Sequence, residues 1–301
     1  MTTKPDETPA SNPNSPVEHD VAVVGGGAAG LAAAVFTARY GLETAVFDGG
    51  KSAIKQCAYI ENYLGFPDGI TPDRFLELGQ AHAEREGATI VDERVTDVRD
   101  HDSGFVVETT ESTTVADRVV VAAAYDGDVL EPLASDLPEP EPFAPTENGR
   151  TEVDGLYIAG WMSNETEHQV GINAGHGARV GLALARDDMS ERYWDAVGER
   201  YVDWVVHEGR YGGEGWDEHV DEWFEQEMLP ADVDRSSYEG GEVEPELIED
   251  AREDLKKEFL DRCIDEDELR RRDREGQRRL LEQFDEEVVM EYAKELEERG
   301  R

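Results

Sequence analysis

A glycine-rich turn between a short apolar strand and a helix constrains this chain more than any other feature. The valine-rich run at residues 21–24 indicates a buried strand, and it leads directly into Gly25. The spacing Gly-x-Gly-x-x-Gly is filled by Gly25, Gly27 and Gly30. The first glycine allows a tight turn, the second lets the backbone approach a pyrophosphate, and the third lets the helix pack against the strand. The pattern therefore predicts a dinucleotide-binding unit.

The residues that follow the glycines fit the same unit. Residues 44–47 read as a second strand, and Asp48 stands at its end. A carboxylate there suits hydrogen bonds to a ribose diol and disfavours the 2′-phosphate of NADP. The helix N-terminus adds free N–H groups and a partial positive charge for the phosphates. The candidate dinucleotide contacts in this stretch are Gly25, Gly26, Gly27, Ala28, Ala29, Gly30, Asp48 and Gly49.

Two other interpretations of this stretch stay open in the sequence. A glycine-rich turn also occurs in other α/β proteins. Residues 21–38 form an uncharged run that is close to the length of a membrane span. Three consecutive glycines and the complete motif spacing favour the dinucleotide site over a span.

The composition is strongly acidic. The chain of 301 residues holds 71 Asp and Glu against 29 Lys and Arg, which gives a net charge of −42 at pH 7. Only six of the basic residues are lysines. Such self-repulsion destabilises a compact state in dilute buffer and is screened by salt, so the composition favours a folded, halophilic protein. No basic face is evident, which argues against a nucleic-acid partner. The glycine unit argues against a wholly disordered acidic chain.

Cysteine use and the N-terminal segment indicate the compartment. Cys57 and Cys263 are too few for a disulfide framework, so a reducing, cytoplasmic setting is expected. Residues 1–17 are rich in Pro, Thr, Ser and Asn and lack the apolar core of a signal peptide. We therefore expect a disordered N-terminal arm and no membrane partner.

Residues 18–188 alternate strand and helix signals. They predict a Rossmann-like α/β domain, with a parallel sheet, flanking helices and a small antiparallel ribbon. Thr71 marks the start of one helix as its N-cap, and Gly87 marks its end. The Pro- and acid-rich residues 126–154 suit an exposed loop, and small residues over 170–185 predict a further helix.

Residues 189–301 change in character to an acidic region of amphipathic helices. Their apolar stripes are expected to pack on each other, on the first domain, or on a second copy in a homodimer. The apolar residues at helical spacing are Trp194, Val197, Tyr201 and Trp204, then Leu247, Ala251, Leu255, Phe259 and Cys263, and then Leu281, Phe284, Val288 and Tyr292.

Three segments together resemble the FAD-binding half of the thioredoxin reductase family, over about residues 18–188. The first is the glycine unit at 25–48. The second, ENYLGFPDGITPDRF at 61–75, is similar to the family's Glu-Asn-Tyr/Trp-x-Gly-Phe-Pro segment. The third, at 153–185, is similar to the family's second flavin motif, in which a strand ends in Ala-Gly-Asp and a Gln-Val pair opens a helix.

The resemblance implies FAD as the cofactor and adds candidate contacts. A strand would deliver Gly160 beside the flavin. The helix opened by Gln169 and Val170 would face the pyrimidine edge of the isoalloxazine, which gains negative charge on reduction. The small residues of this helix would let it lie against the cofactor or the sheet. The further candidate contacts are Asn62, Gly160, Trp161, Gln169, Val170 and Ala174.

The chain departs from the family pattern where electrons would enter and leave. Only residues 126–154 stand where the family carries a nicotinamide-binding domain. The sequence has no second Gly-x-Gly-x-x-Gly and no Cys-x-x-Cys pair. Trp161 replaces the expected Asp, and the expected Ala-Thr-Gly reads Ala-Ala-Tyr-Asp-Gly at 123–127. Disulfide reduction by the family's mechanism is therefore not supported.

Cys57 is the candidate catalytic residue, because the resemblance places it in the segment that passes over the isoalloxazine. Lys51 and Lys55 could favour a thiolate there or bind an anionic substrate. An inert thiol beside two solvated lysines also fits the sequence. His168 suits either a contact to flavin or substrate or a surface position. No cluster shows metal-ligand spacing, so no metal is expected.

Two classes of function follow. The first is an FAD-dependent oxidoreductase whose partner is a small-molecule substrate or a redox carrier, with electrons from the substrate, a diffusing nicotinamide or a carrier such as ferredoxin. The second is a non-catalytic flavin- or dinucleotide-binding protein whose helical region is an interaction or dimer surface. A single-site NAD-binding protein without flavin is a third interpretation.

We expect folding to depend on salt. Raising KCl from dilute to molar should raise the melting temperature, because screening reduces repulsion among the excess carboxylates. Circular dichroism melts across this range would test the expectation. Equal melting temperatures in dilute and molar KCl would contradict the high-salt interpretation.

Overall fold

The computed structural model describes residues 17–101, 104–123, 127–134, 145–163, 167–202, 205–207 and 243–300, with the single positions 222 and 226. The arm predicted over residues 1–17 lies outside these residues, except that Val17 already begins the first strand. Trp204 also lies outside them. Within the chain, residues 1–185 and 186–301 form two compact units, and each is described by itself.

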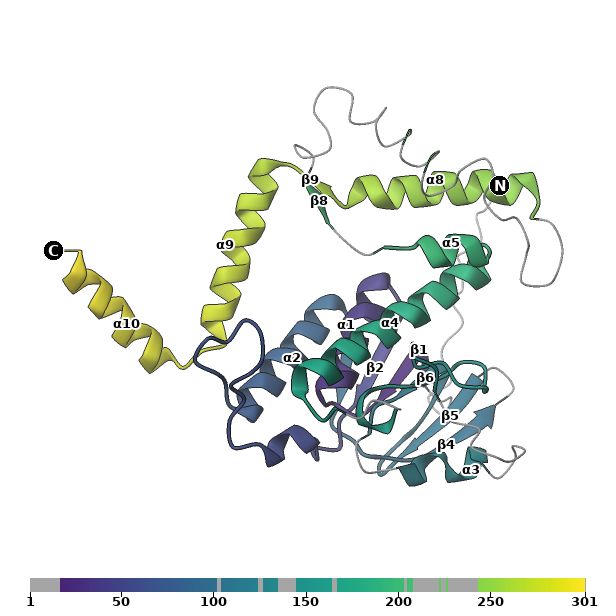
Figure 1. Ribbon diagram of the computed structural model, residues 1–301, viewed down its shortest axis with the longest axis horizontal. Helices are drawn as coiled ribbons and strands as arrows, with labels where there is room; N and C mark the ends of the chain where they lie inside the picture. Colours follow the sequence, from purple (N-terminus) through teal and green to yellow (C-terminus); the bar gives the residue numbers. More distant parts are fainter. Residues whose placement is uncertain are drawn as a thin grey trace, which may run out of the picture. The chain divides into compact units, whose positions relative to one another are not determined.

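A seven-stranded sheet is the frame of the first unit (Figure 1). Its order is β3-β2-β1-β6-β5-β4, and β7 also pairs with β6. Strands β1, β2, β3, β6 and β7 are parallel, and β4 and β5 are antiparallel. This is the predicted α/β fold of Rossmann type. The strands are β1 (Val17–Val24), β2 (Thr44–Phe47), β3 (Thr89–Val91), β4 (Val95–His101), β5 (Gly104–Thr109), β6 (Thr113–Val121) and β7 (Leu156–Ile158).

Strand β6 joins the antiparallel ribbon to the parallel sheet. One of its edges pairs with β1 along nearly its whole length. The other edge divides, since residues 113–116 pair with β5 and residues 119–121 pair with β7. The ribbon is therefore a continuation of the main sheet.

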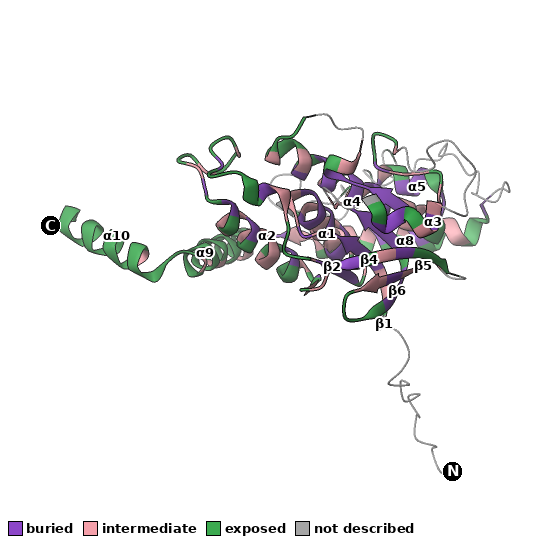
Figure 2. Cartoon of the chain, turned by 90° about the horizontal axis from the view of Figure 1, so that it is seen from below, coloured by how far each residue is buried: buried purple, intermediate pink, exposed green. Residues whose placement is uncertain are grey.

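The two faces of the sheet carry separate cores, because side chains alternate along each strand. Val21 and Val23 of β1 are buried with residues of α1 (Ala28–Tyr40), α2 (Pro72–Glu86) and α4 (Val170–Arg192). Figure 2 shows the buried residues gathered in the sheet and in these helices. Helix α2 begins and ends as predicted, because the Thr71 hydroxyl accepts a hydrogen bond from the Arg74 N–H and Gly87 takes a left-handed conformation.

The second face is covered in part by a segment that was expected to be an exposed loop. Residues 127–134 form η2 (Gly127–Leu130) and α3 (Glu131–Ala134). Val129, Leu130 and Leu133 are buried in the core of this face. The prediction of an exposed loop over 126–154 is therefore wrong for this part. The apolar face here is only about one helical turn long, and the Pro and acidic residues around it favoured a loop.

Helix α4 packs against α1 through backbone contact. A side chain at Gly177 would overlap the Ala29 carbonyl group, and one at Gly181 would lie 2.5 Å from the Ala33 carbonyl oxygen. The small residues of α4 were expected to lie against the cofactor or the sheet. Among them, Gly177 and Gly181 bring α4 into close contact with α1, and α4 runs to Arg192 rather than ending near 185.

The second unit is helical, as expected for the C-terminal part. A short parallel pair, β8 (Val206–His207) with β9 (Cys263–Ile264), is its only sheet among the residues described. Two stripes differ from expectation. Cys263 lies in β9 beyond α8, and the stripe from Leu281 to Tyr292 is divided between two helices. The helices are α5 (Asp195–Arg200), α8 (Pro245–Asp261), α9 (Glu266–Glu282) and α10 (Glu286–Arg299).

A polar cluster fastens α8 within the second unit. The Tyr193 hydroxyl donates to Asp254 Oδ2 at 2.9 Å, and Arg192 forms an ion pair with the same oxygen at 3.1 Å. The Arg192 guanidinium also lies 4.9 Å from the centre of the Tyr193 ring. Burial, with the hydrogen bond to Asp254, raises the pKa of Tyr193 to about 12. Tyr193 therefore stays a neutral hydrogen-bond donor.

No described helix combines the length and the apolar character that a membrane crossing needs. The uncharged run at 21–38 is divided into β1, the glycine turn and α1.

The α1–α4 contact yields a matched pair of variants. Gly177→Ala should lower the free energy of unfolding by about 1–3 kcal/mol, because the new methyl group meets backbone that cannot move aside. Gly175→Ala, two residues away in the same helix, meets nothing within 4 Å and should be neutral or stabilising by up to ~1 kcal/mol. Denaturant unfolding in molar KCl measures both. A Gly177→Ala protein as stable as Gly175→Ala would refute the backbone contact.

Candidate dinucleotide site

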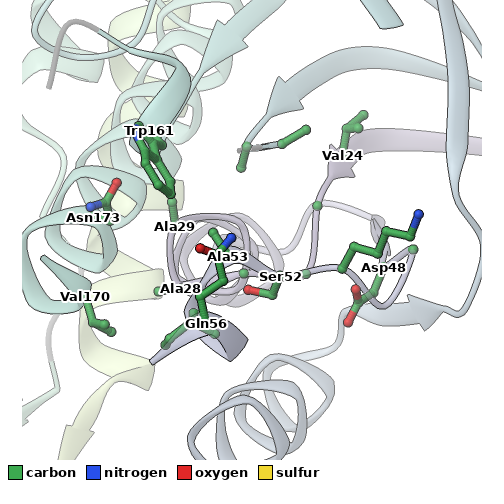
Figure 3. Close-up of a pocket in the computed structure, with 18 of the residues that line it drawn as sticks. Val24, Ala28, Ala29, Asp48, Ser52, Ala53, Gln56, Trp161, Val170 and Asn173 are labelled. Carbon is green, nitrogen blue, oxygen red and sulfur yellow. The ribbon is translucent and has the colours of Figure 1, made fainter. Parts of the chain in front are cut away.

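A cavity of about 510 Å³ opens at the carboxyl ends of β1 and β2, around the first turn of α1 (Figure 3). Its lining comes from the β1–α1 turn, the loop after β2 and the start of α4. β1 lies between β2 and β6, so the order of the strands in the sheet reverses at β1. This point of an open α/β sheet is where ligands bind.

The glycine turn is shaped by close backbone contacts. Gly25 has a φ of 113°, and a methyl group there would lie 2.7 Å from the Ala122 carbonyl oxygen. A side chain at Gly30 would overlap the Gly25 carbonyl group, which explains why Gly30 supports the cavity without lining it. The motif did not predict why residue 26 is glycine. A side chain at Gly26 would overlap the Asp48 carboxyl group.

Gly27 leaves the N-terminus of α1 open to the cavity. It is the N-cap residue, α1 has no side-chain cap, and its first turn holds no acid. The nearest atom to an added methyl group would be Ser52 Oγ at 3.2 Å. Uncapped N–H groups and the helix dipole make such an end a binding site for an anion. The cradle therefore fits a pyrophosphate.

Asp48 is held in place by the protein on both oxygens. Its Oδ1 accepts from the Gly50 N–H at 2.9 Å, and its Oδ2 accepts from Gln80 Nε2 at 3.0 Å. Each carboxylate oxygen has further acceptor capacity for ribose hydroxyls. The sequence did not single out Gln80, which reaches Asp48 from α2.

The charge of the cavity is opposite in sign to that of the chain. Among the described lining residues, Lys51 and Arg94 are basic and only Asp48 is acidic. The chain as a whole carries −42. A phosphate would meet local attraction inside a strongly acidic protein. Lys55, in contrast, donates to the Gly50 carbonyl at 3.4 Å and is absent from the lining.

The far side of the cavity from Asp48 is built by α4 and the segment before it (Figure 3). Gln169 and Val170 line the cavity, and the first turn of α4 holds no acid. Asn62 lies outside the lining but donates from Nδ2 to Gln169 Oε1 at 2.8 Å. This bond joins the second and third segments of the family resemblance. Asn173, which the sequence did not single out, also lines this side.

Gly160 does not line the cavity, and its position is fixed by a buried histidine. The φ of Gly160 is 67°, and its N–H donates to His176 Nδ1 at 2.9 Å. His176 was missed by the sequence reasoning, because a polar residue in a small-residue stripe carries no local signal. The bond fixes the turn at which Trp161 enters the cavity lining. Ala174 is buried in α4 and does not line the cavity.

Besides Phe47 of β2, the lining holds Cys57, Trp161 and His168 as reactive or aromatic groups. The rings of Trp161 and His168 meet edge to face, with centres 4.2 Å apart. Cys57 is an exposed free thiol at the end of η1 (Ala53–Gln56). The residues proposed from sequence that line the cavity are Gly25, Gly26, Gly27, Ala28, Ala29, Asp48, Gly49, Cys57, Trp161, Gln169 and Val170.

Comparison with known proteins agrees with this geometry. Residues 19–123 match the family model described as pyridine nucleotide-disulphide oxidoreductase. The chain is 30% identical over 119 residues to NADPH-dependent thioredoxin reductase 3 of Arabidopsis thaliana, and 37% identical over 79 residues to a thioredoxin reductase of Streptomyces coelicolor. These alignments cover 38% and 25% of this chain but only 22% and 24% of the relatives.

A solved structure shows the same fold. A thioredoxin reductase from Gloeobacter violaceus superposes with a TM-score of 0.51 at 18% identity, covering 63% of this chain and 99% of that chain. The first unit is therefore thioredoxin reductase-like in sequence and in fold. The chain spans less than a quarter of the length of the curated relatives named above.

The Gly160–His176 bond predicts an order for two variants. His176→Leu leaves the buried Gly160 N–H without this acceptor and should lower the free energy of unfolding by about 1–3 kcal/mol. His176→Asn places an amide oxygen near the position of Nδ1 and should cost less. Denaturant unfolding in molar KCl measures both. If packing alone mattered, Leu would be the milder change, and that order would refute the role of the bond.

Proposed function

We propose that the chain binds FAD in the cavity at α1 and is an FAD-dependent oxidoreductase of thioredoxin reductase-like type. FAD is the cofactor that the family match and the fold support. The observation that carries the proposal is the arrangement of an uncapped helix N-terminus, a fixed carboxylate and two basic residues around one cavity. These groups match a pyrophosphate with a ribose beside it.

The two ends of the cavity would bind different parts of FAD. The N–H groups at Gly27 and Ala28 would hold the pyrophosphate, with Lys51 as a nearby cation, and Asp48 would accept from the adenosine ribose. Gln169 and the N-terminus of α4 would hold the pyrimidine edge of the flavin. When bound, FAD supplies the electron-transfer chemistry itself.

The contribution of this chain to that chemistry is electrostatic and positional. The N-terminus of α4 has no acid in its first turn, so its N–H groups stabilise negative charge on the group that they face. The Asn62–Gln169 bond holds the start of this helix in register with the preceding loop. Trp161, His168 and Cys57 are the lining groups available to a substrate.

The electron donor of this proposal differs from that of a complete thioredoxin reductase. The sequence has 29 residues at 126–154, too few for a nicotinamide-binding βαβ unit, and it has no Cys-x-x-Cys pair. A substrate, a diffusing nicotinamide or a carrier such as ferredoxin would supply the electrons. We therefore propose that this chain by itself does not reduce thioredoxin with NADPH at the rate of an ordinary flavoenzyme.

A second candidate is a non-catalytic flavin-binding protein. The observation that favours it is the set of exposed apolar residues on α9 and α10, which suits a helical region that serves in interaction. In that case the bound flavin would stabilise the first unit rather than turn over.

FAD binding is tested by Gly27→Val. Protein purified or reconstituted in molar KCl should show flavin absorption bands, and Gly27→Val should lose them, because the side chain occupies the space for the pyrophosphate. Gly27 has an extended conformation that valine also adopts, so the fold should survive. Circular dichroism checks this, and Gly175→Ala is the matched control that keeps the flavin. Wild-type protein that stays colourless after addition of FAD would refute the proposal.

The same holoprotein separates the two candidates. An oxidoreductase should bleach its flavin band when it is mixed anaerobically with NADH, NADPH or a reduced low-potential carrier. A tightly bound flavin that none of these reduces would favour the non-catalytic protein. Thioredoxin-coupled turnover near 10 per second with NADPH, about the median of enzymes, would show that the proposed electron route is wrong.

A further inference from the structure

Asp48 lies on a short glycine turn, so the orientation of its side chain depends on support from outside that turn. It directly follows β2 and precedes Gly49 and Gly50, and Gly50 has a φ of 72°. The bond from the Gly50 N–H holds only Oδ1 of the carboxylate. Rotation of an Asp carboxylate about the Cβ–Cγ bond is soft, so one bond leaves its plane poorly defined. The bond to Oδ2 therefore decides how the carboxylate is oriented.

Gln80 supplies that second bond from a helix that is packed in place. Its Nε2 lies 3.0 Å from Asp48 Oδ2, and the bond is partly buried. Gln80 stands in the middle of α2. A methyl group at the neighbouring Gly79 would lie 2.9 Å from Leu31 Cδ1, so α2 is packed closely on α1. A group on a packed helix is positioned more precisely than a group on a loop.

The bond orients Asp48 beside the proposed phosphate site. A side chain at Gly26 would overlap the Asp48 carboxyl group, so this carboxyl group lies directly against the glycine turn. Gly27, the next residue, is the N-cap of α1 and lines the cavity together with Asp48. In a dinucleotide the ribose is joined to the pyrophosphate, so both must be met at once. Hydrogen bonds weaken steeply when they are misaligned, so a turned carboxylate would lose the ribose.

The amide of Gln80 suits this role because it is a neutral donor. An ionised carboxylate only accepts hydrogen bonds, so the amide presents its NH2 group to Asp48. The amide leaves the charge of Asp48 intact and leaves lone pairs for the ribose hydroxyls. A lysine or arginine at this position would pair with the carboxylate and compete with the ribose for it. A glutamate would offer only acceptors when ionised and would repel Asp48.

We propose that Gln80 is a positioning residue for the adenosine ribose, because it holds the Asp48 carboxylate in the orientation that accepts from the ribose diol. The inference rests on the proposed function, in which Asp48 meets the adenosine half of FAD. Gln80 does not line the cavity, so its effect passes through Asp48. Loss of the Gln80 amide should weaken ligands that carry the ribose diol and spare ligands that lack it.

The inference is tested with ADP and 2′-deoxy-ADP, which lacks one ribose hydroxyl. Calorimetric titration of the flavin-free full chain in molar KCl should show that the wild type binds ADP about tenfold more tightly than 2′-deoxy-ADP. Gln80→Leu has a side chain of similar size without a donor, and it should bind the two ligands within about twofold of each other. An unchanged preference in Gln80→Leu, or a wild type without any preference, would overturn the proposal.

Inorganic pyrophosphate and a second variant are the matched controls. Pyrophosphate has no ribose, so Gln80→Leu should bind it as tightly as the wild type does. A loss of pyrophosphate binding equal to the loss of ADP binding would show a general structural effect and overturn the positioning role. Gln80→Glu keeps the shape of the side chain but removes the donor, so it should also lose the preference for ADP. A Gln80→Glu protein that keeps the full preference would show that packing alone matters, which also overturns the role.

Titration with FAD separates this inference from the proposed function. A wild type that binds FAD no more tightly than ADP, with a preference for ADP that Gln80→Leu loses, would refute the flavin site and support the role of Gln80. A wild type that binds FAD more tightly than ADP, with the preference for ADP equal in wild type and Gln80→Leu, would support the flavin site and overturn the role of Gln80.

Discussion

The close approach of α1 to its neighbours is the constraint on which the cavity depends. A side chain at Gly25 would meet the Ala122 carbonyl group, and one at Gly30 would meet the Gly25 carbonyl group. A side chain at Gly177 of α4 would meet the backbone of α1. Each contact is possible only without a side chain, so the N-terminus of α1 is delivered to the carboxyl edge of the sheet with its N–H groups free. The position of the cavity, its preference for an anion and the placement of α4 all follow from these contacts.

Charge is distributed unevenly over this acidic chain, and the described lining of the cavity is an exception. Lys51 and Arg94 line the cavity, where a pyrophosphate is proposed to bind. In a protein of −42, a locally positive surface lowers the cost of bringing in another anion.

The sequence predicted what local geometry decides. The glycine spacing, Asp48 at the end of β2 and the Thr71 cap each act within a few residues, and the structure has them as predicted. Features that depend on contacts between distant segments were missed or misread. The helix-packing role of Gly177, the bond from Gly160 to His176 and the buried face of α3 have no signal in their own neighbourhoods. The resemblance identified both ends of the cavity, but it did not supply Gln80 or the Asn62–Gln169 bond.

The central claim is that one cavity holds a flavin at the start of α4 and an adenosine ribose at Asp48. A titration of the flavin-free protein in molar KCl with FAD and with FMN, followed by flavin fluorescence, tests it most directly. FMN lacks the adenosine that Asp48 would bind, so FAD should bind at least about tenfold more tightly, a difference of roughly 1.4 kcal/mol or more. Equal affinity for the two flavins, or tighter binding of FMN, would contradict the account.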